Sequence, residues 1–213
     1  MRRKAICQSR LTKNTYKTTI HARVVKLILE AIITSENDDG TIHVAPMGPH
    51  VSDDLSEWTL KPFQTSTTFR NLYAKNRCVV NIVDDALLLA QAVVGQANES
   101  HARYVDEVGY VLNAACHWYG LTITSWDVTQ PRAIAKCSIG SKRVSHPFFG
   151  WNRAKHSVLE LAILVSRLKM LEKSFIQSEI ERLRVLIDKT AGERESIAFD
   201  LLVDHINRQE NVS

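Results

Sequence analysis

The sequence places four consecutive hydroxyl side chains, Thr-Ser-Thr-Thr, at residues 65–68. Apolar residues follow them at helical spacing, so this run predicts the N-terminus of a helix. The first N–H groups of a helix have no intrahelical acceptor and carry partial positive charge, which favours phosphate binding. Lys61 or Arg70 could add charge at the same place. Simple helix capping at a solvated loop is the alternative, because Ser and Thr are common N-cap residues.

The segment HVAPMGPH at residues 43–50 is a second candidate, because a strand-like run stops there at Pro46. Proline ends strand pairing, and a glycine at position 48 would let a planar ring approach the backbone. Lys-Pro-Phe at residues 61–63 is a third segment that ends a strand-like run. Together the three segments favour a ligand with a flat ring and a phosphate, although an ordinary loop would also fit residues 46–49.

These three segments belong to the strand-rich first part of the chain. Residues 26–34 and 41–45 have β-rich composition and flank Asp39-Gly40, which predicts a hairpin. The pair Asp84-Asp85 would cap a helical segment over residues 87–94. Further strands are expected at residues 57–63, 78–83, 118–126 and 133–139. The last two of these would form an antiparallel pair.

After Gly150 the chain has helical periodicity. Apolar residues recur at three- and four-residue spacing over residues 158–168 and 176–187, and a third helix is expected at residues 197–206. Strands first and helices last predict an α+β fold, mainly β, such as a barrel followed by helices. Neither a Gly-x-Gly-x-x-Gly nor a Gly-Lys-Ser/Thr loop is present, which argues against a Rossmann oxidoreductase and a P-loop NTPase.

Composition and charge argue against several classes of partner. The chain has 213 residues and a formal charge of +4, and the first 17 residues contain basic side chains but no acid. A solvated basic tail is favoured over a nucleic-acid interface, which would form a basic stripe on a folded face. No apolar run approaches the ~20 residues of a membrane span, so no membrane partner is expected.

The motifs predict neither a metal site nor a catalytic side chain. Four cysteines without a Cys-x-x-Cys pair are typical of reduced thiols in a cytoplasmic protein. None of the eight histidines belongs to a His-Glu-x-x-His pattern. The pairs Asp53-Asp54 and Asp84-Asp85 favour turns and helix caps over acid-base chemistry. The Gly-x-Ser-x-Gly elbow of a serine nucleophile is absent.

Five motifs taken together resemble a known family. They are APMG at residues 45–48, KPF at 61–63, TSTTFRNL at 65–72, VVNIVDD at 79–85 and GWNRAKHSVLELAILVSRL at 150–168. Over residues 22–170 the chain is similar to uncharacterised flavin-reductase-like proteins with the FMN-binding split β-barrel fold, frequent in archaea and found in some bacteria. The long basic N-terminal tail departs from the pattern of that family.

The resemblance implies a homodimer of antiparallel split barrels with FMN bound at the subunit interface. The groove at the isoalloxazine ring would be formed by Ala45, Pro46, Met47 and Gly48, together with Lys61 and Phe63. The phosphate would be held by Thr65, Ser66, Thr67 and Thr68, with Asn71 nearby. Asn81 would contact the ring from a neighbouring strand, whereas Asn152 and Arg153 would lie near FMN or the dimer interface.

The residues and the resemblance together give the expected domain organisation and function. Residues 1–20 would be a flexible basic tail, residues 21–148 the split barrel, and residues 149–213 helices that pack on the barrel or at the dimer interface. The implied activity is that of an FMN-dependent oxidoreductase, with NAD(P)H or another electron donor. The alternative is a non-catalytic FMN-binding or assembly protein, linked to tetrahydromethanopterin-dependent one-carbon metabolism. No catalytic residue is assigned, because flavin chemistry belongs largely to the cofactor.

Overall fold

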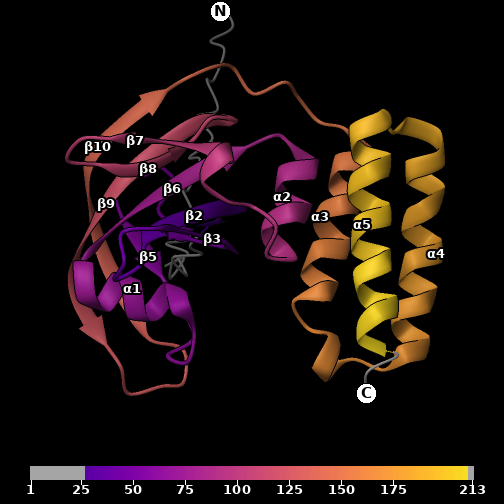
Figure 1. Cartoon of the computed structure of the whole chain (residues 1–213), viewed down its shortest axis with the longest axis horizontal. Coiled ribbons are helices and arrows are strands. Elements are labelled where there is room, and N and C mark those ends of the chain that lie inside the picture. The colour runs from indigo at the N-terminus through magenta and orange to yellow at the C-terminus, as the bar shows by residue number, and fades with distance from the viewer. Residues whose placement is uncertain (1–26, 211–213) are drawn as a thin grey trace, which may run out of the picture.

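One antiparallel sheet of eight strands forms the first layer of the molecule, and helices form a second layer beside it (Figure 1). The computed structural model describes residues 27–210. In sheet order the strands are β1 (Leu27–Ile28), β4 (His50–Val51), β5 (Trp58–Leu60), β10 (Ile134–Val144), β9 (Ala115–Asp127), β6 (Arg77–Val83), β2 (Ala31–Glu36) and β3 (Ile42–Met47). The predicted order of strands first and helices last is confirmed.

A single bent hairpin closes this sheet on itself. Strand β1 leads almost directly into β2, and β3 leads almost directly into β4. The paired strands β1 and β4 nevertheless stand at one end of the strand order, and the paired strands β2 and β3 stand at the other end. Residues Ala31–Glu36 pair with Ile42–Met47, whereas Leu27 and Ile28 pair with β4. Gly48 lies at the bend, where an added Cβ would come within 2.7 Å of the Ile28 Cγ2 atom. A side chain at position 48 would therefore have to displace the Ile28 side chain.

The predicted hairpin and helix starts are present where the sequence placed them. The β2–β3 turn contains Gly40 at a φ of +84°, and the Asp39 carboxylate accepts the N–H of Thr41. Helix α1 (Thr67–Lys75) has Ser66 as its N-cap. Helix α2 (Ala86–Val93) is capped by Asp85, whose Oδ1 accepts two N–H groups of its first turn. Local turn and cap chemistry thus determines these boundaries.

A second, smaller hairpin was not predicted from the sequence. After the short 3₁₀ helix η1 (Glu99–His101), strands β7 (Ala102–Val105) and β8 (Gly109–Leu112) form their own two-stranded sheet. The Thr34 hydroxyl donates to the carbonyl of Tyr110, and the Tyr110 hydroxyl donates to the carbonyl of Gly40 at 2.8 Å. These two bonds hold the hairpin against β2 and the β2–β3 turn.

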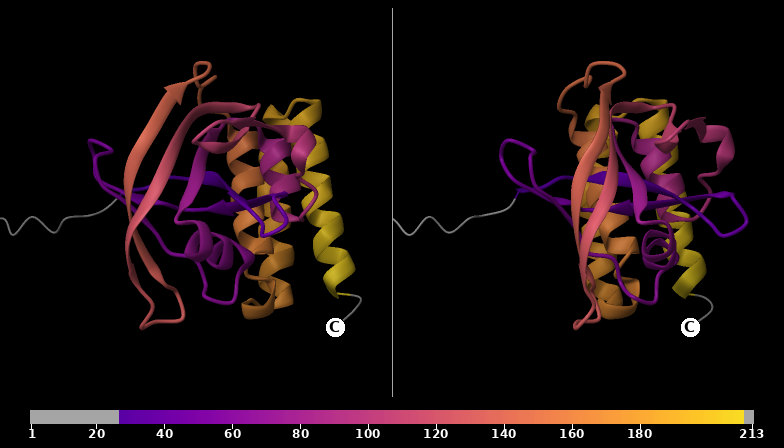
Figure 2. Two further views of the ribbon diagram at one scale, coloured as in Figure 1. Left: turned by 60° about the vertical axis from the view of Figure 1, so that its left-hand side comes forward. Right: turned by 90° about the vertical axis from the view of Figure 1, so that its left-hand side faces the viewer.

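The helical layer contains α3 (Arg153–Val165), the short η2 (Leu168–Met170), α4 (Lys173–Thr190) and α5 (Glu193–Glu210). The views in Figure 2 show these helices side by side next to the barrel. Although α2 belongs to the barrel part of the sequence, its Ala86 and Ala90 join the same apolar core as Leu161, Leu183 and Phe199. Helix α2 is therefore the link between the two layers.

The helices of the described range lack the combination of length and apolar composition that a membrane span requires. The predicted basic tail, residues 1–20, lies outside the residues that the structure describes.

Candidate functional site

The end of β3 and the start of α1 meet directly in the folded chain. The His43 Nε2 atom lies 3.0 Å from the Thr68 hydroxyl, at hydrogen-bond distance. His43 is half-buried and Thr68 is buried. This contact joins β3 to the first turn of the helix, so the first two predicted segments do lie together. The strand does not end at Pro46 as expected, because Pro46 and Met47 still pair with β2.

The third segment is connected to both of the others. Strands β4 and β5 pair with His50 opposite Thr59, and the same register continued by two residues would bring Lys61 beside Gly48. Phe63 begins the loop that leads into α1, and its carbonyl accepts the Ser66 hydroxyl at 2.7 Å. The third segment therefore leads directly into α1, and β3 pairs with β2 alone among the described strands.

The four hydroxyl groups of residues 65–68 differ in how they are used. Ser66 both donates to Phe63 and accepts the N–H of Phe69, so the helix cap occupies it. Thr68 is buried against His43. The Thr67 hydroxyl accepts a hydrogen bond from the Arg70 guanidinium at 2.8 Å, and Thr65 is exposed. Thr65 and Thr67 are therefore the hydroxyls best placed to reach a ligand.

The first turn of α1 also provides backbone donors and positive charge. In the described part of the chain no acceptor is found for the N–H of Thr67 or Thr68. No acidic side chain occupies this turn, and Arg70 lies within it. Burial lowers the pKa of His43 from its ordinary value, and the nearby Arg70 lowers it further. The arrangement presents N–H groups, a guanidinium and a neutral imidazole, which suit an anion such as phosphate.

Aromatic side chains and the β9–β10 turn support the loop before α1. The Arg132 guanidinium lies 4.3 Å from the centre of the Phe63 ring, and Phe63 is about half exposed. The Gln64 side chain donates to the carbonyls of Val128 and Gln130 at 2.8 and 2.7 Å. Lys61 is half-buried. The turn after β9 thus holds Phe63 and the helix start in place, a role that the sequence did not indicate.

Two predicted asparagines are engaged with the barrel itself. Asn71 donates to the Ser35 hydroxyl at 3.1 Å and to the Asn37 side chain at 2.8 Å, which fixes α1 on β2. Asn81 is completely buried; its amide donates to the Ile32 carbonyl and accepts the N–H of Leu112 at 2.9 Å. Both side chains position the elements of the site, and direct contact of either with a ring or phosphate stays a prediction.

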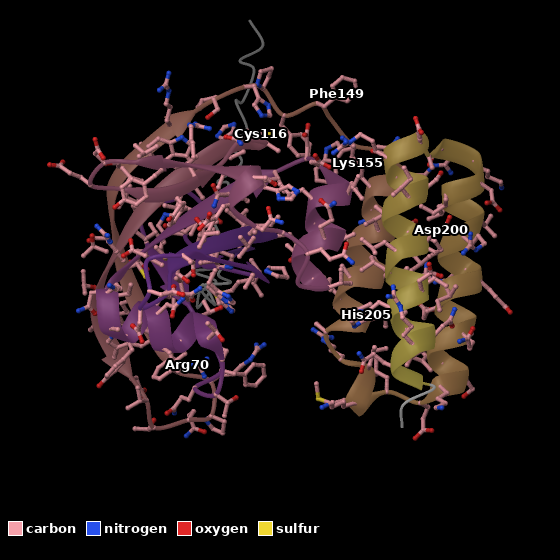
Figure 3. All side chains as sticks on the ribbon, viewed as in Figure 1. Arg70, Cys116, Phe149, Lys155, Asp200 and His205 are labelled. Carbon is pink, nitrogen blue, oxygen red and sulfur yellow. The ribbon has the colours of Figure 1, made fainter. Side chains whose placement is uncertain are left out.

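Asn152 and Arg153 are not brought to this region by the fold of one chain. Asn152 caps α3 by accepting the N–H of Lys155 at 3.0 Å and donates to the Thr190 carbonyl at the end of α4. Figure 3 shows Lys155 at the upper end of the helical layer and Arg70 at the lower end of the barrel. Arg153 is exposed.

The expected turn and cap roles are confirmed for Asp54 and Asp85, whereas Asp84 accepts the N–H of Phe149. Hydrogen bonds from Ser52 and Ser56 lower the pKa of Asp54 to about 2, and they close the β4–β5 loop. Asp85 caps α2. Among residues 27–210, no group of three or more His, Cys, Asp or Glu side chains could hold a metal ion.

The chain matches family models along most of its length. The model described as "Protein of unknown function (DUF447) N-terminal domain" matches residues 29–146, and a second DUF447 model matches residues 152–204. A search of curated proteins found no match.

Two solved structures are similar to this chain to different degrees. An FMN-bound DUF447 protein from Methanosarcina mazei is 20% identical, with a TM-score of 0.74 over 85% of this chain and 96% of that one. The flavin reductase of a styrene monooxygenase from Pseudomonas putida is 11% identical, with a TM-score of 0.44 over 55% of this chain and 80% of that one. The two matching models show that the chain belongs to the DUF447 family, and its eight-stranded barrel with C-terminal helices is the fold of the Methanosarcina mazei protein.

Proposed function

We propose that the barrel binds FMN, with the phosphate at the first turn of α1 and the isoalloxazine ring along residues 45–48. The observation that carries this proposal is the contact between His43 and Thr68. It joins β3, an outer strand of the sheet, to the first turn of α1, where backbone N–H groups are available to a ligand. The Methanosarcina mazei protein of the same family and fold is FMN-bound, which supports the choice of flavin.

The groups present fit such a ligand. A phosphate at α1 would receive the N–H groups of Thr67 and Thr68, the hydroxyls of Thr65 and Thr67, and the charge of Arg70. The dipole of the nine-residue helix favours the same anion. Residues 45–48 are half-buried, and 45–47 belong to the outer strand of the sheet, where a planar ring could rest on the backbone. Ser66 would contribute through its cap, which keeps the turn in shape.

A homodimer would complete this site. Within the described strands, β3 has a neighbour on one side only, so a ring lying along it would stay open to water on the other. A second copy could cover that side. Asn152 and Arg153 stand at the start of α3, away from α1 of their own chain, so any contact they make with FMN would come from the partner. Sedimentation with and without FMN tests this arrangement; a monomer in both states would contradict it.

The activity that we propose is flavin-dependent oxidoreduction, with NAD(P)H or another electron donor. Bound FMN would supply the redox chemistry, and the protein would hold the phosphate, orient the ring and limit its contact with water. The test is a titration of the purified protein with FMN, followed by anaerobic addition of NADH or NADPH. Binding at micromolar affinity or better, and bleaching of the flavin band, are the expected results.

A non-catalytic FMN-binding protein is the second candidate. It is favoured by the structural role of His43, whose imidazole lies 3.0 Å from the Thr68 hydroxyl and so joins β3 to α1. FMN that binds tightly but is reduced by no donor would support this candidate over the oxidoreductase.

A further inference from the structure

A hollow lies in the helical layer, at the turn where α3 leads through η2 into α4. Its volume is about 620 Å³, and residues of the C-terminal half of α5 complete its wall. Small-molecule sites in proteins typically measure about 300–1,000 Å³. Figure 3 shows His205, one of these wall residues, on the lower part of α5. The hollow is therefore large enough for a small ligand and is separate from the flavin groove of the barrel.

The lining of this cavity combines an apolar part with a charged part. Val165 and Ile176 are buried, and Leu171 is half-buried, so apolar side chains form the floor. Arg167 and Lys169 lie at the mouth and are exposed. A ligand that fills the cavity would contact both parts at once, with its apolar body on the floor and its polar head toward the cations.

The charge of the cavity has one sign. Arg167, Lys169 and Lys173 all line it, and the lining contains no Asp or Glu. Arg167 lies near enough to Glu30 of the barrel to lower the pKa of the Glu30 carboxyl. Among the ion pairs of the described residues, however, none within 4.0 Å joins Glu30 to Arg167. Glu172 precedes Lys173 in the chain, but the lining itself contains cations and no carboxylate. Such a lining attracts anions, and the apolar floor lowers the dielectric around the cations.

We propose that this cavity binds a small amphipathic anion, in which a carboxylate, sulfonate or phosphate is attached to a flat or short apolar body. The anionic head lies between Arg167, Lys169 and Lys173, and the body covers Val165 and Ile176. The site is independent of FMN binding, because it shares no residue with the groove at α1.

The methionines of the chain provide separate reporters for the two sites. The sequence contains three, of which Met47 lies in the proposed flavin groove and Met170 lines the cavity. Protein labelled with ¹³C at the methionine methyl groups is titrated with 1-naphthalenesulfonate, and its signals are assigned with Met47→Leu and Met170→Leu. We expect a saturable shift of the Met170 signal and a constant Met47 signal. The neutral analogue 1-naphthalenesulfonamide should bind at least about tenfold more weakly, because it lacks the charge.

Two triple variants separate the local charge from the total charge. Arg167→Gln/Lys169→Gln/Lys173→Gln should lower the affinity for the sulfonate by at least about tenfold. The matched control Lys136→Gln/Lys142→Gln/Arg143→Gln removes three exposed cations from β10. This control should change the affinity for the sulfonate by less than about twofold. Equal binding of sulfonate and sulfonamide, or equal losses in the two triple variants, would overturn the anion site. A shift of Met47 alone would also overturn it and would leave the FMN proposal intact.

Discussion

The barrel and the helical layer have cores of different chemistry. Among the described residues, the buried polar side chains of the barrel and α1 are Thr34, Ser35, Thr59, Thr68, Asn71 and Asn81. The helical layer contains one, Ser157, whose hydroxyl donates to the Arg153 carbonyl of its own helix. Its core otherwise consists of side chains such as Leu161, Leu183 and Phe199.

This difference indicates a division of labour. Buried hydrogen bonds are directional, so those of the barrel fix α1, β2 and the β7–β8 hairpin in one arrangement around the proposed flavin groove. Apolar packing in the helical layer is less directional and contributes mainly stability. Changes in the helical core should therefore alter the free energy of unfolding with little effect on flavin affinity, whereas changes at α1 should do the reverse.

The largest effect is expected in the helical core. Phe199 is completely buried, so Phe199→Ala should lower the free energy of unfolding by about 3–5 kcal/mol. Ile197→Ala on the same helix is the control, because Ile197 is 49% exposed and should cost far less. Urea denaturation followed by circular dichroism measures both. Similar losses for the two variants would show that α5 does not pack as described.

The next effect concerns the polar core of the barrel. Asn81→Ala would leave the N–H of Leu112 and the carbonyl of Ile32 without the Asn81 amide, at a cost of about 2–3 kcal/mol. Hydrogen exchange should rise first in β7 and β8, because Leu112 belongs to that hairpin. Asn113→Ala, at an exposed neighbouring position, serves as the control. Uniform acceleration throughout the chain would argue against a local role for Asn81.

A smaller and more selective effect is expected at the helix start. Thr67→Ala removes one hydroxyl from the proposed phosphate site. It should lower the affinity for FMN by about three- to tenfold and leave the affinity for riboflavin nearly unchanged. Ser174→Ala is the matched control, since it removes a hydroxyl from the first turn of α4. Flavin fluorescence quenching gives all the affinities. Equal losses of affinity for FMN and riboflavin would show that Thr67 does not contact the phosphate.

The smallest effect is a dependence of stability on pH. The pKa of His43 is lowered in the folded chain by burial and by Arg70. On acidification the unfolded chain therefore takes up the proton first, near the ordinary pKa of 6.5, and stability falls as the pH moves below that value toward the folded pKa. His43→Gln retains a hydrogen-bonding group but does not titrate, so it should lose less stability than the wild type between about pH 7.5 and about pH 5.5. Parallel stability profiles would contradict this.

Local chemistry explains which elements could be predicted from the sequence. The Asp39-Gly40 turn, the Ser66 and Asp85 caps and the three C-terminal helices each depend on neighbouring residues, and all are present. The β7–β8 hairpin was missed because its strands are short and its contacts with Thr34 and Asn81 come from distant strands. The close approach of Gly48 to the Ile28 side chain joins two segments that are distant in sequence, so no local pattern reveals it.

The candidate site could be predicted only in part. The hydroxyl run and the strand ends marked three segments, but their meeting depends on the His43–Thr68 contact, which spans 25 residues. His43 and Arg132 were not expected to support the site, because a lone histidine or arginine carries no signal in a single sequence. Asn152 and Arg153 could be placed at a helix start, but their relation to a flavin depends on a second copy of the chain.

The central claim, a flavin groove with its phosphate at α1, is tested most directly by comparing FMN with riboflavin on the wild-type protein. The two ligands share the ring and the ribityl chain and differ in the phosphate alone. We predict micromolar or tighter binding of FMN and at least about tenfold weaker binding of riboflavin, because charge-assisted bonds to the first turn of α1 would be lost. Equal affinity for the two, or no binding of either, would contradict the claim.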